Sequence, residues 1–192
     1  MVRLTAKIHE VIVTTKNADG TAHHAPMGVS EVNGYFQIKP FKPSTTYNNL
    51  MRHRSCSINY TDDVRVFAGA LTGHRQWPSS ACEKIDSLYL TNALSHTEIA
   101  IQNVDDDDPR ACFYGDVVHE QQHGLFRGYN RAQGAVIEAA ILVSRLSMLP
   151  EQKIRDEINY LIIGMEKTAG EREWEAWGWL MKKVREAGIN VE

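Results

Sequence analysis

The stretch His9-Glu10-Val11-Ile12-Val13-Thr14-Thr15 is rich in β-branched residues and alternates partly in polarity, a pattern typical of a β-strand. It runs into Asn17-Ala18-Asp19-Gly20, where Gly20 can take the positive φ that a tight turn requires. A second strand over residues 21–29 would then close a hairpin. The chain is therefore predicted to begin as an antiparallel β protein.

Strand patterns continue to about residue 130. Further strands are predicted at residues 35–38, 55–60, 98–104 and 110–118, the last two joined across the turn Asp105–Pro109. Ser44-Thr45-Thr46 is predicted to cap a short helix that ends at His53. Asp62-Asp63 is expected to start a helical turn, and the polar residues 73–87, with Pro78 among them, are predicted to form a loop.

The remaining residues have helical patterns. Residues 135–149 are Ala-rich and end at Pro150, and a helix over 170–187 places Trp174 and Trp177 on one face. Between them lies a stripe of apolar residues at helical spacing: Ile154, Ile158, Leu161, Ile162 and Met165. Strands followed by helices predict an α+β chain, with a β-barrel domain at 1–130 and a C-terminal helical unit at 131–192.

Composition limits the class of protein. The chain has 192 residues, of which 43% are hydrophobic and 23% charged, as in ordinary soluble globular proteins. Its net charge of -3 argues against broad electrostatic capture of nucleic acid, and no apolar run approaches the ~20 residues of a membrane span. Three scattered cysteines, Cys56, Cys82 and Cys112, indicate reduced thiols. We expect a cytoplasmic protein that has neither nucleic acid nor membrane as a partner.

One segment matches a zinc-binding motif. His119-Glu120-Gln121-Gln122-His123 is a literal H-E-x-x-H, which on a helix would bind zinc through both histidines and use Glu120 as a general base. The residues before it resemble a strand, however, and Phe126 and Tyr129 stand where the extended motif requires glycine and histidine. A zinc hydrolase built on His119, Glu120 and His123 is therefore a distant alternative, and no metal ligand is predicted.

Two other segments contain more polar chemistry than a structural strand requires. In His23–Gly28, Pro26 lacks an amide donor and Gly28 permits close backbone approach, so backbone groups could face a flat ligand. In Lys42–Leu50, three hydroxyls at a helix start follow a lysine, which together suit a phosphate group. The alternative is a bulged edge strand and an ordinary helix cap.

Motifs in these segments resemble a known superfamily. The motifs, in chain order, are Thr14-Thr15…Asp19-Gly20…His24-Ala-Pro-Met-Gly28, Thr46-Tyr-x-Asn-Leu50 and Ser57-Ile-Asn-Tyr-Thr-Asp-Asp63. Together they resemble the FMN-binding split-barrel superfamily, which includes flavin reductases. Later motifs at Asn130–Ala132, Ile137–Ala139 and Lys167–Gly170 are similar to those of a family of uncharacterised archaeal and bacterial proteins with a helical C-terminal extension.

The resemblance implies a six-stranded, Greek-key split β-barrel, usually a homodimer with noncovalent FMN near the subunit interface. By position it implies that Pro26, Met27 and Gly28 flank the isoalloxazine and that Asn59 and Tyr60 approach the ring edge. It further implies that the phosphate end is held by Lys42, Thr45, Thr46 and Asn49. Arg131 is a further phosphate candidate, because a guanidinium pairs with phosphate oxygens; a buried ion pair with Glu138 is the alternative.

An FMN-dependent oxidoreductase of flavin-reductase type is thereby expected. It would move hydride or electrons through the flavin and take them from NAD(P)H or another electron donor. No catalytic side chain is assigned, although His24 could donate a proton near the ring or serve only as a structural hydrogen-bonding group. A noncatalytic flavin-binding module is the alternative from a different class.

Overall fold

The structure, a computed structural model, describes residues 6–191, and these form two compact units. One unit contains the described residues up to Thr61 together with Trp77–Leu125, and it holds all the strands. The other contains Asp62–Gln76 and the described residues from Phe126 onward, and its regular elements are helices. The predicted α+β class is confirmed.

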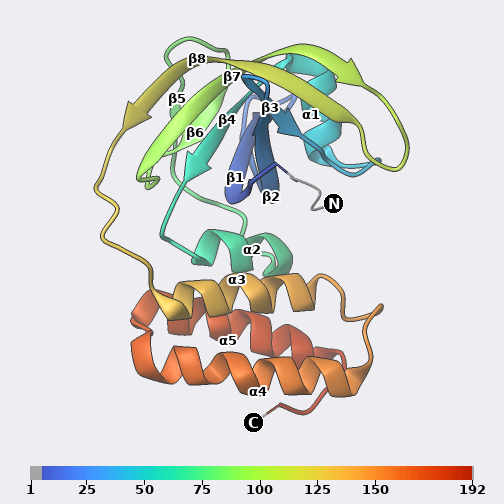
Figure 1. Cartoon of the computed structure of the whole chain (residues 1–192), viewed down its shortest axis with the longest axis vertical. Helices are drawn as coiled ribbons and strands as arrows, with labels where there is room; N and C mark the ends of the chain where they lie inside the picture. The colour runs from blue at the N-terminus through green and yellow to red at the C-terminus, as the bar shows by residue number, and fades with distance from the viewer. Residues whose placement is uncertain (1–5, 192) are drawn as a thin grey trace, which may run out of the picture. The chain divides into compact units, whose positions relative to one another are not determined.

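The first unit is a closed barrel of six strands (Figure 1). Around the barrel the strands are β1 (Ile8–Lys16), β2 (Ala22–Val32), β3 (Tyr35–Ile38), β8 (Cys112–Gln122), β7 (Ser95–Asp105) and β4 (Ser55–Tyr60). Each strand is antiparallel to its neighbours, and β4 returns to pair with β1 and closes the barrel. This is the six-stranded split barrel that the sequence motifs predicted.

Alternate residues of the strands fill the barrel, because successive side chains of a strand point to opposite faces. Val11 and Val13 of β1, Ile58 of β4 and Phe113 of β8 are buried in one apolar cluster. Leu50 joins that cluster from α1 (Thr45–His53). The predicted cap of this helix is present, since the Ser44 side chain accepts a hydrogen bond from the backbone N–H of Tyr47.

The segment predicted as a loop at residues 73–87 contains a strand. β5 (Ser79–Ala81) pairs with β6 (Leu88–Leu90) in a separate two-stranded sheet. Strands of three residues are too short to show a polarity pattern, so no local sequence signal marks them. β8 is also longer than predicted, because its end pairs with Ser95–Glu98 of β7.

The second unit contains α2 (Arg65–Thr72), α3 (Arg131–Val143), α4 (Glu151–Thr168) and α5 (Glu171–Glu186). Apolar residues from all four helices share one core, including Ala68, Ile158, Met165 and Trp177, so residues 62–76 pack with the C-terminal helices. α3 begins earlier than predicted, because the Asn130 side chain caps it by accepting the N–H groups of Ala132 and Gln133.

Within residues 6–191, no helix combines the length and apolarity that a membrane crossing requires.

Candidate functional site

The outer face of the barrel has two rows of paired residues across β2, β1, β4 and β7. Paired residues on antiparallel strands point to the same face of the sheet. The rows are His24, Thr14, Ser57 and Glu98, and beside them Pro26, Ile12, Asn59 and His96. Residues 77–91, which include β5 and β6, bind to this face through the contacts described below. We call these residues the covering segment and the face that they contact the covered face.

Asn59 is the central residue of the covered face. Its amide nitrogen donates to the carbonyl oxygen of Ile12 at 2.9 Å and to the hydroxyl of Thr14 at 3.0 Å. Its amide oxygen accepts the backbone N–H of Leu90 at 2.7 Å, and the side chain is fully buried. Asn59 was predicted to approach a flavin ring, but its hydrogen-bonding groups connect β4, β1 and β6 inside the protein.

Glu98 binds the turn of the covering segment. Its buried carboxylate accepts the backbone N–H groups of Glu83 at 2.7 Å, Lys84 at 2.8 Å and Ile85 at 3.2 Å. Burial acts to raise the pKa of this carboxyl group, but these N–H groups and the His96 ring outweigh it and hold the pKa below its ordinary value. Glu98 is therefore ionised at neutral pH and anchors the turn.

His24 also contacts the covering segment. Its Nδ1 lies 2.8 Å from the Thr14 hydroxyl and its Nε2 lies 3.0 Å from the Ser79 hydroxyl. Burial disfavours the charged imidazolium and the neighbouring His23 adds to this, so the pKa of His24 falls to about 4. The ring is neutral at pH 7 and both nitrogens are engaged, which favours the structural role.

The α1 residues that were predicted to bind the phosphate divide into two groups, buried and exposed. Thr46 and Asn49 are buried, and the Asn49 amide donates to the Thr15 hydroxyl at 3.0 Å and to the Asn17 side chain at 2.9 Å. These two residues therefore fix α1 against the end of β1. Thr45, in contrast, is exposed in the first turn of the helix.

Lys42 lies at the start of the same helix but already has anionic partners. Its ammonium is 3.0 Å from a carboxylate oxygen of Asp106, 3.0 Å from one of Asp108 and 5.3 Å from the ring centroid of Tyr47. The two carboxylates raise the pKa of Lys42. No acidic residue lies in the first turn of α1 itself. The Lys42 ammonium is therefore positioned to attract an anion at this end of the helix, but it already pairs with two carboxylates.

The predicted ring-binding residues lie on β2 and at the end of β4. Pro26 and Met27 are half-buried on β2. Gly28 is exposed, and a Cβ there would lie 2.6 Å from Cγ2 of Ile8. The close approach that glycine permits at this position is therefore made by a side chain of the barrel itself. Tyr60 is half-buried and lines a hollow of about 330 Å³ together with Thr97 and Glu120, among other residues.

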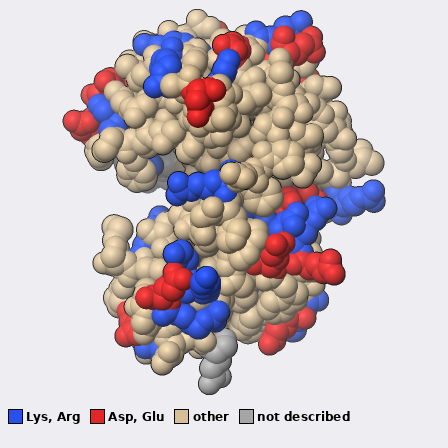
Figure 2. Space-filling model, turned by 180° about the vertical axis from the view of Figure 1, so that it is seen from behind, with Lys and Arg blue, Asp and Glu red and all other residues tan. Residues whose placement is uncertain are grey.

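Among the ten predicted residues, Tyr60 alone lines the hollow of about 330 Å³. All but Arg131 belong to the barrel unit. Arg131 is the first residue of α3 and is exposed, as is Glu138, so the buried ion pair considered for these two residues is not formed. On the face drawn in Figure 2, basic and acidic side chains are interspersed, so an anionic ligand depends on local positive groups.

The H-E-x-x-H segment does not form a helical zinc site. Residues 119–122 belong to β8, where residues four apart lie about 13 Å apart along the strand. His119 lies 3.4 Å from a carboxylate oxygen of Glu83, while the ring of His123 bonds to that of His96 at 2.8 Å. The arrangement that a zinc hydrolase of this type requires is therefore absent from this segment.

The central position of Asn59 generates a prediction on stability. Asn59→Ala should lower the free energy of unfolding by about 3 kcal/mol, because it leaves buried groups of Ile12, Thr14 and Leu90 without their partner. Urea unfolding measures the loss, and hydrogen exchange at the Leu90 amide should become faster. Asn103→Ala, at an exposed site on β7, should change neither quantity. An unchanged Leu90 amide in Asn59→Ala would contradict the assigned role.

His24 generates a prediction on pH dependence. Above pH 6.5 its ring is neutral in the folded and the unfolded chain, so it contributes no pH dependence there. As the pH falls from 6.5 toward 4, the unfolded chain binds a proton that the folded chain does not, and stability should fall by up to about 3 kcal/mol. Unfolding curves of His24→Gln should lose this part of the pH dependence. The exposed control His9→Gln should retain it, and equal slopes in the two variants would refute the prediction.

Three solved structures are similar in fold. The FMN-bound protein MM1853 from Methanosarcina mazei matches with a TM-score of 0.80 at 18% identity, over 94% of this chain and 96% of that one. An FMN-binding protein from Thermus thermophilus matches at 0.52 and 14% identity, over 62% and 72% of the two chains. The Streptomyces globisporus NADH:FAD oxidoreductase SgcE6 matches at 0.51 and 14%, over 62% and 78%. These likenesses establish the split-barrel fold.

Curated proteins give no match. Two family models match most of the chain, and MM1853 is described as a member of the same family. The model described as "Protein of unknown function (DUF447) N-terminal domain" covers residues 9–124 and corresponds to the barrel. The model described as "Protein of unknown function (DUF447)" covers residues 130–182, within the helical unit. This chain is a member of the DUF447 family.

Proposed function

We propose that this protein binds FMN noncovalently and moves hydride or electrons through it, as a flavin reductase-like oxidoreductase. The main support is the match to FMN-bound MM1853, a protein of the same family, over 94% of this chain. The barrel also matches an NADH:FAD oxidoreductase, which supports a nicotinamide as the electron donor.

The start of α1 is the proposed position of the FMN phosphate. Lys42 would supply positive charge, and the exposed Thr45 would supply a hydroxyl at the positive end of the helix dipole. Thr46 and Asn49 would hold the helix in place from their buried positions. The donor set suits a phosphate, provided that the phosphate replaces one of the carboxylates that now contact Lys42.

The ring of FMN is proposed to lie along the open side of β2. Pro26 of the covered face and Met27, which packs against the barrel core, are half-buried on β2, and Gly28 beside them is exposed. Tyr60 lines the hollow at the end of β4, and Asn59 would support it through its bonds on the covered face. Bound FMN supplies the hydride and electron chemistry, and the residues of the chain bind and orient it.

A homodimer is part of the proposal. A second copy of the chain would enclose the exposed positions at the start of α1 and on β2. Ile8, Val117 and Val118 are exposed apolar residues on the barrel strands that such a contact could cover. Arg131 remains a proposed phosphate ligand because its side chain is exposed. A cytoplasmic location is proposed as well, since all three cysteines are free thiols.

The visible spectrum tests the proposal. The purified protein should be yellow, or should bind added FMN with one molecule per chain in a fluorescence titration. Under anaerobic conditions, NADH or NADPH should bleach the bound flavin. A protein that ignores FMN would refute the proposal altogether. Bound FMN that dithionite bleaches and both nicotinamides leave oxidised would exclude a nicotinamide-dependent reductase and favour a noncatalytic flavin-binding module.

The ion pairs of Lys42 provide a second test of the proposed FMN site. The double variant Asp106→Asn/Asp108→Asn releases Lys42, so FMN should bind about fivefold more tightly while riboflavin, which lacks the phosphate, binds as before. Asp105→Asn/Asp107→Asn removes the same charge from the same turn without releasing Lys42, and should leave the ratio of the two affinities close to wild type. Equal changes for FMN and riboflavin would place the phosphate elsewhere.

A further inference from the structure

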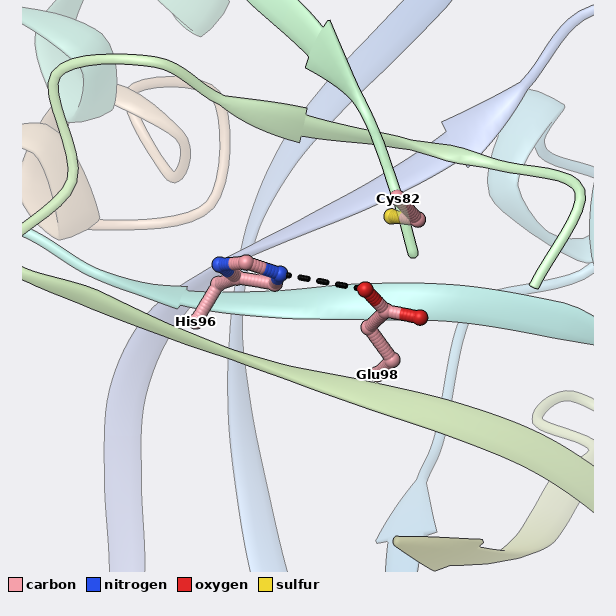
Figure 3. A group of neighbouring side chains, drawn as sticks. All are labelled: Cys82, His96 and Glu98. Carbon is pink, nitrogen blue, oxygen red and sulfur yellow. Dashed lines mark hydrogen bonds and ion pairs between the residues drawn. The ribbon is translucent and has the colours of Figure 1, made fainter. Parts of the chain in front are cut away.

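Three side chains with metal-binding atoms meet beneath the covering segment (Figure 3). Cys82 follows β5 in that segment, and His96 and Glu98 are two residues apart on β7, so they share its outer face. Their ligand atoms all lie within 4.8 Å of one another, and both β7 side chains are buried. None of the three is among the residues proposed to bind FMN, although His96 lines the same hollow as Tyr60.

We propose that Cys82, His96 and Glu98 bind one divalent ion of the zinc type, which joins the covering segment to the barrel. Thiolate, imidazole and carboxylate are the ligands that zinc uses in proteins. A thiolate and a carboxylate contribute two negative charges and the neutral imidazole none, so a divalent cation leaves the buried cluster without net charge.

The hydrogen bonds already present are compatible with a metal. One carboxylate oxygen of Glu98 accepts the Glu83 N–H at 2.7 Å and lies 3.3 Å from Nε2 of His96. A carboxylate oxygen has two lone pairs, so the metal can take the place of the proton between this oxygen and His96. The three backbone N–H groups on Glu98 then keep their partner.

The surroundings orient His96 as a metal ligand requires. Its other ring nitrogen lies 2.8 Å from Nε2 of His123, and the ring of Tyr89 stacks on it with the centroids 4.0 Å apart. Metal-binding histidines in proteins usually bond through their second nitrogen in this way, which fixes the tautomer and the ring plane. His96 would bind the metal through Nε2 and donate its Nδ1 proton to His123.

His119 offers a fourth ligand. It lies opposite Glu98 on β8, so both side chains point to the same face. Its Nε2 is buried, makes no hydrogen bond and lies 3.4 Å from a carboxylate oxygen of the exposed Glu83. It is not among the residues whose ligand atoms lie within 4.8 Å of one another, so its ring would have to move toward the cluster to complete the four ligands of a structural zinc site.

Metal binding would release one proton. Burial and the neighbouring Glu98 raise the pKa of Cys82 to about 12, so without metal the sulfur is a neutral thiol. The metal–sulfur bond forms as the thiol proton leaves to solvent. The His96 proton moves from Nε2 to Nδ1, and the His123 proton moves likewise from Nε2 to Nδ1, so that Nε2 of His123 accepts the bond from His96. Affinity should therefore weaken as the pH is lowered.

Thiol labelling of the full-length protein tests the site directly. After removal of metal with a chelator, one equivalent of Zn²⁺ should bind per chain, as measured by elemental analysis after gel filtration. Zn²⁺ should slow the reaction of iodoacetamide with Cys82 at least tenfold, with peptide mass spectrometry as the readout. Cys112, which is also partly exposed, is the internal control and should react at an unchanged rate. Equal labelling of Cys82 with and without Zn²⁺ would overturn the proposal.

Variants and a spectroscopic metal identify the ligands. Cys82→Ser should weaken Zn²⁺ binding at least tenfold, whereas Cys112→Ser should bind as the wild type does; equal affinity in both would overturn the proposal. Should Cys82→Ser not fold, Co²⁺ in the wild-type protein decides, because a thiolate ligand gives a charge-transfer band in the difference spectrum. Co²⁺ that binds without this band would exclude Cys82. These readouts do not depend on flavin, so they stand whether or not FMN binding is confirmed.

Discussion

The side-chain amide of Asn59 connects the barrel to the segment that covers it, and much of the first unit depends on that connection. The covering segment has only two strands of three residues each. Such short strands supply few backbone hydrogen bonds of their own. Its position is therefore set by polar groups of the barrel, namely Asn59 on Leu90, Ser57 on Leu88, Glu98 on residues 83–85 and His24 on Ser79.

This constraint explains the polarity of the barrel strands that the covering segment contacts. Most residues that point into the barrel are apolar, whereas Thr14, Ser57 and Asn59 are polar and equally buried on the other face. A buried polar group is stable only when it is hydrogen-bonded, so these residues and the covering segment require each other. Contacts within the protein therefore explain part of the polar strand pattern that suggested a ligand.

The sequence predicted those parts of the fold that have local causes. The strands at 35–38 and 55–60 and the helix capped by Ser44 lie where the pattern and capping signals placed them. The pairing of β5 with β6, the contact of Lys42 with Asp106 and the packing of residues 62–76 with the C-terminal helices were not predicted. Each joins residues that local patterns treat separately, and a single sequence contains no signal for them.

The hydrogen bonds of residues 77–91 to the barrel limit where a flavin can lie. Asn59 and His24 have all their polar atoms engaged beneath residues 77–91, so a ligand could reach them only by displacing that segment and breaking its hydrogen bonds. Each such bond is costly to leave unmade when it is buried. A flavin is therefore expected at positions that residues 77–91 leave open: the start of α1, where Thr45 is exposed, and the edge of β2 at Gly28. Both positions are on the surface of a single chain, where the proposed homodimer would enclose the cofactor.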